Sequence, residues 1–144
     1  MDKIEKTIDI TAPVSRVWRA LTDHAEFGEW FRVALDQPFS EGALSTGRMT
    51  YPGFEGWPWR ATVERIEPER LFRFRWHDYD GQGDIADQAE TTVTFILTPI
   101  DTGTRLTVVE SGFENLPDHR RIPVMRDNTS GWEIQLGNIA AHVA

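Results

Sequence analysis

Glu110 is a carboxylate that the sequence places on the apolar face of a strand. Between residues 104 and 111 apolar and polar side chains alternate with a period of two, so Leu106, Val108 and Glu110 share one face. An acid that ends an apolar face lies either at a strand tip in water or at the polar floor of a cavity. This position therefore decides what chemistry the chain can perform.

Two interpretations of Glu110 follow from the cost of burying a carboxylate without a partner. In the first, Glu110 is a hydrogen-bonding or proton-accepting group for a ligand. In the second, it is a structural carboxylate held by Lys6, Arg73, Arg75 or backbone amides, because buried charges are usually paired. Both interpretations stay open from the sequence.

Other residue patterns argue against metal, cofactor or nucleophile chemistry. The four histidines are scattered without a pair at ligand spacing, and the chain has no cysteine. Residues 78–85 have the acids and the glycine of a calcium loop, but Ala89 stands where such a loop has its closing glutamate. A nucleophile elbow and a glycine-rich phosphate loop are also missing from the sequence. The sequence therefore predicts no metal, no cofactor and no nucleotide-using enzyme.

Composition sets the broad class of the protein. A chain of 144 residues with 40% hydrophobic residues predicts a single domain over residues 1–144. The formal net charge of -8 disfavours nucleic acid and anionic membrane surfaces as partners. The first residues lack the apolar run of a signal peptide, and no segment is apolar enough to span a bilayer. We therefore expect a cytoplasmic protein.

The first third of the chain predicts one strand and two short helices. Isoleucines alternate with polar residues over 4–10, which predicts a strand with its isoleucines inward. Pro13 is suited to the first turn of a helix, and the apolar spacing after it predicts a helix that ends near 22–23. The spacing of aromatic residues over 27–31 predicts a second short helix.

The middle of the chain predicts an antiparallel sheet with one wet face. Turn residues separate short runs of strand character, of which the clearest are 59–66, 71–77, 91–98 and 104–111. In the second run Phe72, Phe74 and Trp76 fall on one face, and basic residues fall on the other. The apolar face of this sheet needs a cover.

The C-terminal segment predicts that cover. From Pro123 onward apolar residues recur every three or four positions, which predicts a long helix with one apolar stripe. Gly131 and Gly137 interrupt it, and each costs about 1 kcal/mol relative to alanine. We expect these glycines to mark close approach to another backbone. The order of elements predicts an α+β fold in which the long helix packs on the sheet.

Several segments carry a family resemblance through their order and spacing. They are residues 10–14 with 17–23, 66–68 with Leu71 and Phe74, 103–107 with 110–113, and Asn128 with Gly131, Trp132 and Leu136. Together they resemble the START-like, helix-grip domains, and among these the branch named after activator homologues of the heat-shock protein 90 ATPase. The resemblance covers about residues 4–143. It implies a curved antiparallel sheet of six or seven strands wrapped around a long C-terminal helix, with two short helices after the first strand and a cavity between sheet and helix.

Such a cavity gives a role to the six tryptophans and eight phenylalanines of the chain. Trp18 and Phe95 are expected to be core residues, and Phe95 is also kept as a candidate for the cavity. The candidate ligand-binding residues are Trp30, Phe72, Phe74, Trp76, Phe95, Val108, Glu110, Trp132 and Leu136. The loop 51–59 is rich in proline, glycine and aromatic residues, and is either a hairpin turn or a mobile lid.

Three functions remain open. The first is binding of a small, largely apolar molecule, aromatic or lipid-like, without catalysis. The second, implied by the family name, is interaction with a chaperone whose ATPase is stimulated, although the eukaryotic activators carry a further N-terminal domain for which we expect no room here. The third is a cyclase-like or dehydratase-like enzyme that uses Glu110, with His77 or Tyr51 nearby, as some START-like relatives use cavity acids.

Overall fold

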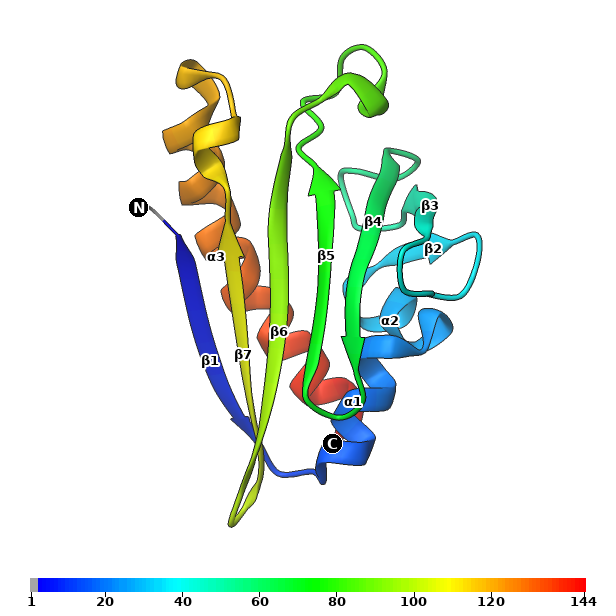
Figure 1. Ribbon diagram of the computed structural model, residues 1–144, viewed down its shortest axis with the longest axis vertical. Coiled ribbons are helices and arrows are strands. Elements are labelled where there is room, and N and C mark those ends of the chain that lie inside the picture. Colours follow the sequence, from blue (N-terminus) through cyan, green and yellow to red (C-terminus); the bar gives the residue numbers. More distant parts are fainter. Residues whose placement is uncertain (1–2) are drawn as a thin grey trace.

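The computed structural model describes residues 3–144 and has an α+β fold built on one seven-stranded antiparallel sheet (Figure 1). The strands lie in the order β1-β7-β6-β5-β4-β3-β2. In chain order the elements are β1 (Ile4–Ile10), α1 (Val14–Thr22), α2 (His24–Phe31), β2 (Val33–Leu35), β3 (Leu44–Met49), β4 (Pro58–Glu67), β5 (Leu71–His77), η1 (Ile85–Asp87), β6 (Glu90–Ile100), β7 (Gly103–Ser111), η2 (Phe113–Asn115) and α3 (Asp118–Val143). The predicted fold class is confirmed.

The long helix α3 covers one face of the sheet, as predicted. Figure 1 shows it crossing that face diagonally, from the side of β1 toward α1 and α2. It packs against β1 at one edge and against α1 and α2 at the other. The apolar core fills the space between this helix and the sheet, and Phe27, Phe72, Phe74, Phe95 and Phe113 are fully buried in it.

The two faces of the sheet differ as the alternation predicts. On β5, Phe72 and Phe74 point into the core with no exposed surface. Arg73 and Arg75 lie on the opposite face, where both pair with Glu64 of β4, at 3.3 and 2.6 Å. One face of the sheet is therefore an apolar wall, and the other carries ion pairs in contact with water.

Helix α3 begins five residues earlier than predicted. It starts at Asp118, so Pro123 lies inside the helix rather than in its first turn. Two arginines anchor the added turn. The guanidinium of Arg120 donates to Asp78 at 2.6 and 3.1 Å, and that of Arg121 donates to the backbone carbonyls of residues 113, 114 and 116. These contacts offset the helical hydrogen bond that a proline cannot make.

The expectation that the helical glycines mark close backbone contact is wrong. A β-carbon added at Gly131 or Gly137 meets no atom within 4 Å outside the adjacent helical turns. Gly137 is exposed, whereas Gly131 is partly covered and faces the interior. The absence of a side chain at Gly131 therefore leaves space inside the fold.

Candidate functional site

Two adjoining pockets open between the first half of α3, the sheet and two loops. They have volumes of about 230 and 280 Å³. Both are lined by Phe31, Met49, Phe54, Trp76 and Asn128, so they form one cavity with two lobes. This cavity lies at the end of the strands where the loop 50–57 joins β3 to β4 and the loop 78–89 joins β5 to β6.

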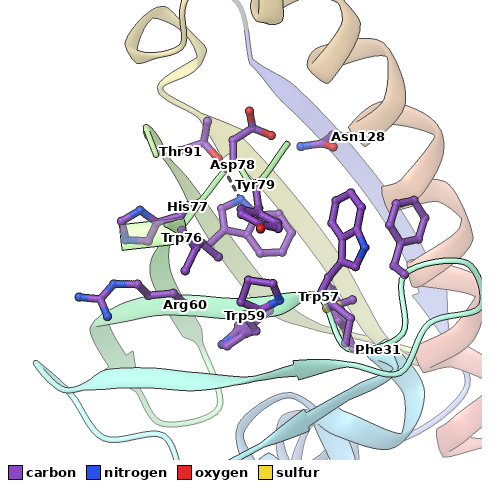
Figure 2. Close-up of a pocket in the computed structure, with 14 residues that line it drawn as sticks. Phe31, Trp57, Trp59, Arg60, Trp76, His77, Asp78, Tyr79, Thr91 and Asn128 are labelled. Carbon is purple, nitrogen blue, oxygen red and sulfur yellow. Dashed lines mark hydrogen bonds between the residues drawn. The ribbon is translucent and has the colours of Figure 1, made fainter. Parts of the chain in front are cut away.

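The first lobe is walled mainly by aromatic rings. Figure 2 shows Trp57, Trp76 and Tyr79 gathered around it, with Asn128 above them and Phe31 below. The polar members of its lining are largely occupied by bonds within the chain. His77 Nδ1 contacts the carbonyl of Gln88 at 2.9 Å, and the carboxylate of Asp78 pairs with Arg120 at 2.6 Å. The side chains of His77 and Arg60 point away from Trp57 in Figure 2, and Arg60 Nε is a buried donor that has no partner among residues 3–144.

Among the described residues 3–144, those that line the second lobe carry no carboxylate, ammonium, guanidinium or imidazole group. Besides the shared residues, its lining consists of Tyr51, Gly131, Trp132 and Gln135. The missing side chain of Gly131 provides part of its volume, because nothing lies within 4 Å of the position that a β-carbon would take. This lobe suits an apolar, uncharged body.

Glu110 lies behind this cavity, fully buried on the inner face of β7. Its oxygen Oε2 accepts hydrogen bonds from Trp76 Nε1 at 2.9 Å and from Thr91 Oγ1 at 2.6 Å. Its oxygen Oε1 accepts from Trp132 Nε1 at 2.9 Å, and Asn128 Nδ2 reaches both oxygens, at 3.0 and 3.2 Å. Five hydrogen bonds from four side chains therefore hold one carboxylate.

All four donors to Glu110 are neutral, so the interpretation that basic residues hold it is wrong. Lys6 pairs with Glu133 of α3 at 3.2 Å, and Arg73 and Arg75 pair with Glu64 on the far face of the sheet. Arg73 and Arg75 lie on the outer face of the sheet and cannot reach a carboxylate on the inner face, whereas Lys6 shares the inner face but pairs with Glu133 of α3. Hydrogen bonds rather than ion pairs compensate the burial of the carboxylate.

The carboxylate joins two tryptophans from different elements. Trp76 is on β5 and Trp132 is on α3, and their rings are stacked with centroids 5.6 Å apart and planes 22° apart. Because each indole N–H donates to Glu110, neither ring can rotate without breaking that hydrogen bond. The two ring systems form a fixed wall of the second lobe.

The nine residues predicted to bind a ligand fall into three groups. Trp76 and Trp132 line the cavity, and Glu110 lies directly behind them. The other six are buried core residues outside the lining of either lobe, namely Trp30, Phe72, Phe74, Phe95, Val108 and Leu136. Trp30 is fixed there, because its indole N–H donates to the carbonyl of Ala20 at 2.8 Å.

Several lining residues were not predicted. Phe31, Met49 and Phe54 line both lobes, and Asn128 connects the lining to Glu110. A signal for Asn128 exists in the sequence, since it precedes Trp132 by four residues and therefore shares its face of the helix. Phe31 ends α2, Met49 ends β3 and Phe54 lies in the loop before β4, so no periodic pattern gave a comparable signal for them.

The loop 50–57 is both a connection and a wall. It turns the chain from β3 to β4, with the amide of Phe54 donating to the carbonyl of Tyr51 at 2.9 Å. The ring of Trp57 packs edge-on against Phe54 at 5.0 Å and against Tyr79 of the neighbouring loop at 5.4 Å. The two loops therefore meet through aromatic contacts at the rim of the cavity.

Within residues 3–144, histidines and acids do not come together in groups of three or more that could hold a metal ion. Among the helices of this part of the chain, none has the length and apolar character needed to cross a membrane.

Comparison with known proteins gives consistent results. The fold is similar to the crystal structure of protein MLL2253 from Mesorhizobium loti, with 25% identity, a TM-score of 0.81 and coverage of 99% of this chain and 96% of that chain. It is also similar to DynU16 from the dynemicin biosynthetic locus, with 26% identity and a TM-score of 0.77, where the match covers 99% of this chain and 47% of that chain. Protein CV1439 from Chromobacterium violaceum shares the fold at 20% identity, with a TM-score of 0.76 and coverage of 99% and 98%.

No curated protein matches the sequence significantly. The family model described as "Activator of Hsp90 ATPase homolog 1-like protein" matches residues 11–144, which is nearly the whole chain. The chain therefore belongs to the family of Activator of Hsp90 ATPase homolog 1-like proteins.

Proposed function

We propose that the chain acts as one binding domain for a small, largely apolar aromatic molecule, held in the cavity between α3 and the sheet. The observation that carries this proposal is the pair of stacked indoles, Trp76 and Trp132, fixed by Glu110 at the wall of the second lobe. Rigid aromatic walls lose little conformational entropy when a flat ligand packs on them. Ligand sites are typically apolar with a few placed polar groups, and this cavity has that composition.

The contacts of Glu110 favour recognition over catalysis. A general base must reach the proton that it removes. Glu110 has no exposed surface, already accepts five hydrogen bonds, and is separated from the cavity by the donors that surround it. The residues expected beside it in a catalytic arrangement, His77 and Tyr51, are not among its contacts. In this proposal Glu110 positions the wall and does not touch the ligand.

The two lobes, of about 230 and 280 Å³, set an upper limit on the ligand. Sites for drug-sized molecules usually have volumes of about 300–1,000 Å³. The second lobe is therefore matched to a compact ring system, whereas a long acyl chain needs both lobes and the rim. Naphthalene is a suitable first probe because it has an aromatic body and no polar group.

A pair of glycine variants tests the proposal within one helix. Gly131→Leu places a side chain in the second lobe, whereas Gly137→Leu places the same side chain on the exposed side of α3. Both changes raise helix propensity by a similar amount, so both variants should fold. We expect naphthalene to shift the indole N–H signals of Trp76 and Trp132 in NMR spectra of the original chain and of Gly137→Leu, and to leave Gly131→Leu unchanged.

Two results contradict this proposal. If naphthalene and related ring systems at saturating concentration shift none of the indole N–H signals, an aromatic binding site of this size is excluded. Equal binding by Gly131→Leu and Gly137→Leu places any binding outside the second lobe.

A further inference from the structure

The polar atoms of the second lobe differ in whether the chain already uses them. Gln135 is held by the chain at both ends of its amide, because its Nε2 donates to the carbonyl of Phe31 at 3.0 Å and its Oε1 accepts from Asn138 at 3.0 Å. The indole N–H of Trp76 and that of Trp132 are both occupied by Glu110. The other polar side chains in the lining of this lobe are Tyr51, from the loop 50–57, and Asn128, which shares its acceptor Glu110 with both stacked indoles and is therefore held beside them.

Asn128 has a fixed orientation. Its amide nitrogen donates to both oxygens of Glu110, at 3.0 and 3.2 Å. Turning the amide over places its oxygen against the carboxylate oxygens, which repel it, so the assignment of nitrogen and oxygen follows from the chemistry. The amide oxygen Oδ1 must therefore point away from Glu110.

Within residues 3–144, Asn128 Oδ1 has no hydrogen-bond partner. It is accessible rather than buried, because the buried side-chain atoms that lack a partner do not include it. Asn128 lines both lobes. A carbonyl oxygen with free lone pairs accepts hydrogen bonds and donates none. The cavity therefore presents an oriented acceptor beside two aromatic faces.

The charge around this acceptor selects against anions. In the part of the chain that the structure describes, no basic side chain lines the second lobe, and the carboxylate of Glu110 lies 3.0 Å behind the amide of Asn128. A ligand carboxylate or phosphate in this lobe gives up its hydration without gaining a cation. An uncharged hydroxyl or N–H group meets no such cost.

We infer that the ligand is an uncharged aromatic molecule with one hydrogen-bond donor, a phenolic hydroxyl or a heteroaromatic N–H, which Asn128 Oδ1 accepts. This inference rests on the proposed function, because it specifies the chemistry of a ligand in the same cavity. The donor fixes the in-plane orientation of a ring that stacking alone leaves free to slide.

Four probes with one ring system test the inference: naphthalene, 2-naphthol, 2-methoxynaphthalene and 2-naphthoate. If the hydroxyl of 2-naphthol donates to Asn128 Oδ1, 2-naphthol should bind about fivefold more tightly than naphthalene. If the hydroxyl is buried without a partner, 2-naphthol should bind about tenfold more weakly than naphthalene. The methoxy probe keeps the oxygen and lacks the donor, so it should bind no better than naphthalene, and 2-naphthoate should bind most weakly.

The variant Asn128→Leu supplies the protein side of the test. The preference for 2-naphthol over naphthalene should reverse in this variant, and the ratio of the two dissociation constants cancels any shared damage to the wall. Binding of naphthalene with no preference for 2-naphthol in the original chain overturns this inference and leaves the proposed function standing. If none of the four probes binds, both this inference and the proposed function are overturned. Tight binding of 2-naphthoate overturns the assignment of an uncharged ligand, and this outcome can be read even if Asn128→Leu does not fold.

Discussion

The indole N–H groups of Trp76 and Trp132 donate to different oxygens of one buried carboxylate, each at 2.9 Å. Glu110 thereby couples β5, β7 and α3 at the wall of the cavity. Removing one acceptor from such a set leaves a buried donor unsatisfied, which costs about 1–3 kcal/mol. The carboxylate is therefore expected to support both the stability of the fold and the shape of the site.

The variant Glu110→Gln tests this coupling. The amide keeps the shape of the side chain but replaces an acceptor oxygen with an NH₂ group that faces the donors. We expect the free energy of unfolding in urea to fall by about 3 kcal/mol and the near-ultraviolet circular dichroism of the tryptophans to change. The control is Glu133→Gln, which removes the exposed partner of Lys6 and should change the stability by less than about 0.5 kcal/mol. Equal stability of Glu110→Gln and the original chain contradicts the coupling.

Strand alternation predicted the face on which Glu110 lies, and together with helical spacing and the family resemblance it predicted the fold. It was not sufficient to separate the cavity wall from the core, because Phe72, Phe74 and Trp76 share one face of β5. Only Trp76, near the open end of the strand, reaches the cavity. Which residues of one strand face reach the cavity depends on how the loops and α3 close the open end of the sheet. A periodic pattern in the sequence contains no information about this closure.

The hydrogen-bond partners of Glu110 could not be predicted from the sequence for a related reason. Strand register pairs Trp76 with Thr91 and places Glu110 on the next strand, so these three meet only once all three strands are aligned. Lys6, Arg73 and Arg75 suggested ion pairs, yet the two arginines lie on the other face of the sheet and Lys6 pairs with Glu133 of α3. Register and face together, rather than residue type, decide which groups a buried carboxylate contacts.

The helical glycines make a prediction about stability. A β-carbon at Gly137 meets open space on an exposed part of α3, so Gly137→Ala should raise the free energy of unfolding by about 1 kcal/mol. Gly131→Ala should stabilise the helix by a similar amount but narrow the second lobe, and naphthalene should bind it more weakly. Chemical denaturation and the NMR titration separate the two effects. Destabilisation by Gly137→Ala contradicts the open environment at this position.

Glu26 links the three helices and makes stability depend on pH. Its carboxylate accepts from Arg16 and Arg19, each at 2.7 Å, and contacts His142 of α3 at 2.9 Å. Partial burial alone raises the pKa of Glu26, but the hydrogen bonds from His142, Arg16 and Arg19 outweigh it and lower the pKa from 4.5 to about 2. The stabilisation is therefore fully present above pH 4.5 and is lost as the pH falls toward about 2, because the unfolded chain takes up the proton first.

The size of this effect can be measured with Glu26→Gln. After allowance for the remaining exposure of the carboxylate, we expect a loss of about 2 kcal/mol at pH 7. The variant should also show a weaker pH dependence of unfolding between pH 4.5 and about 2. Glu29→Gln is the control, since this neighbour on α2 is exposed and lies 3.8 Å from His142. An unchanged pH dependence in Glu26→Gln contradicts the assignment.

The contact between Trp57 and Gly81 predicts that the rim of the cavity responds to a single methyl group. Gly81 has φ +90°, and a β-carbon there lies 3.0 Å from the Trp57 ring, so Gly81→Ala both strains the backbone and displaces the indole. Gly42→Ala imposes a similar strain at φ +83° with no atom within 4 Å. Both variants should lose about 1 kcal/mol of stability in urea. Because the displaced Trp57 ring packs on Phe54, which also lines the second lobe, naphthalene binding in the NMR titration should weaken only in Gly81→Ala. Equal binding by both variants shows that the position of Trp57 does not shape the site.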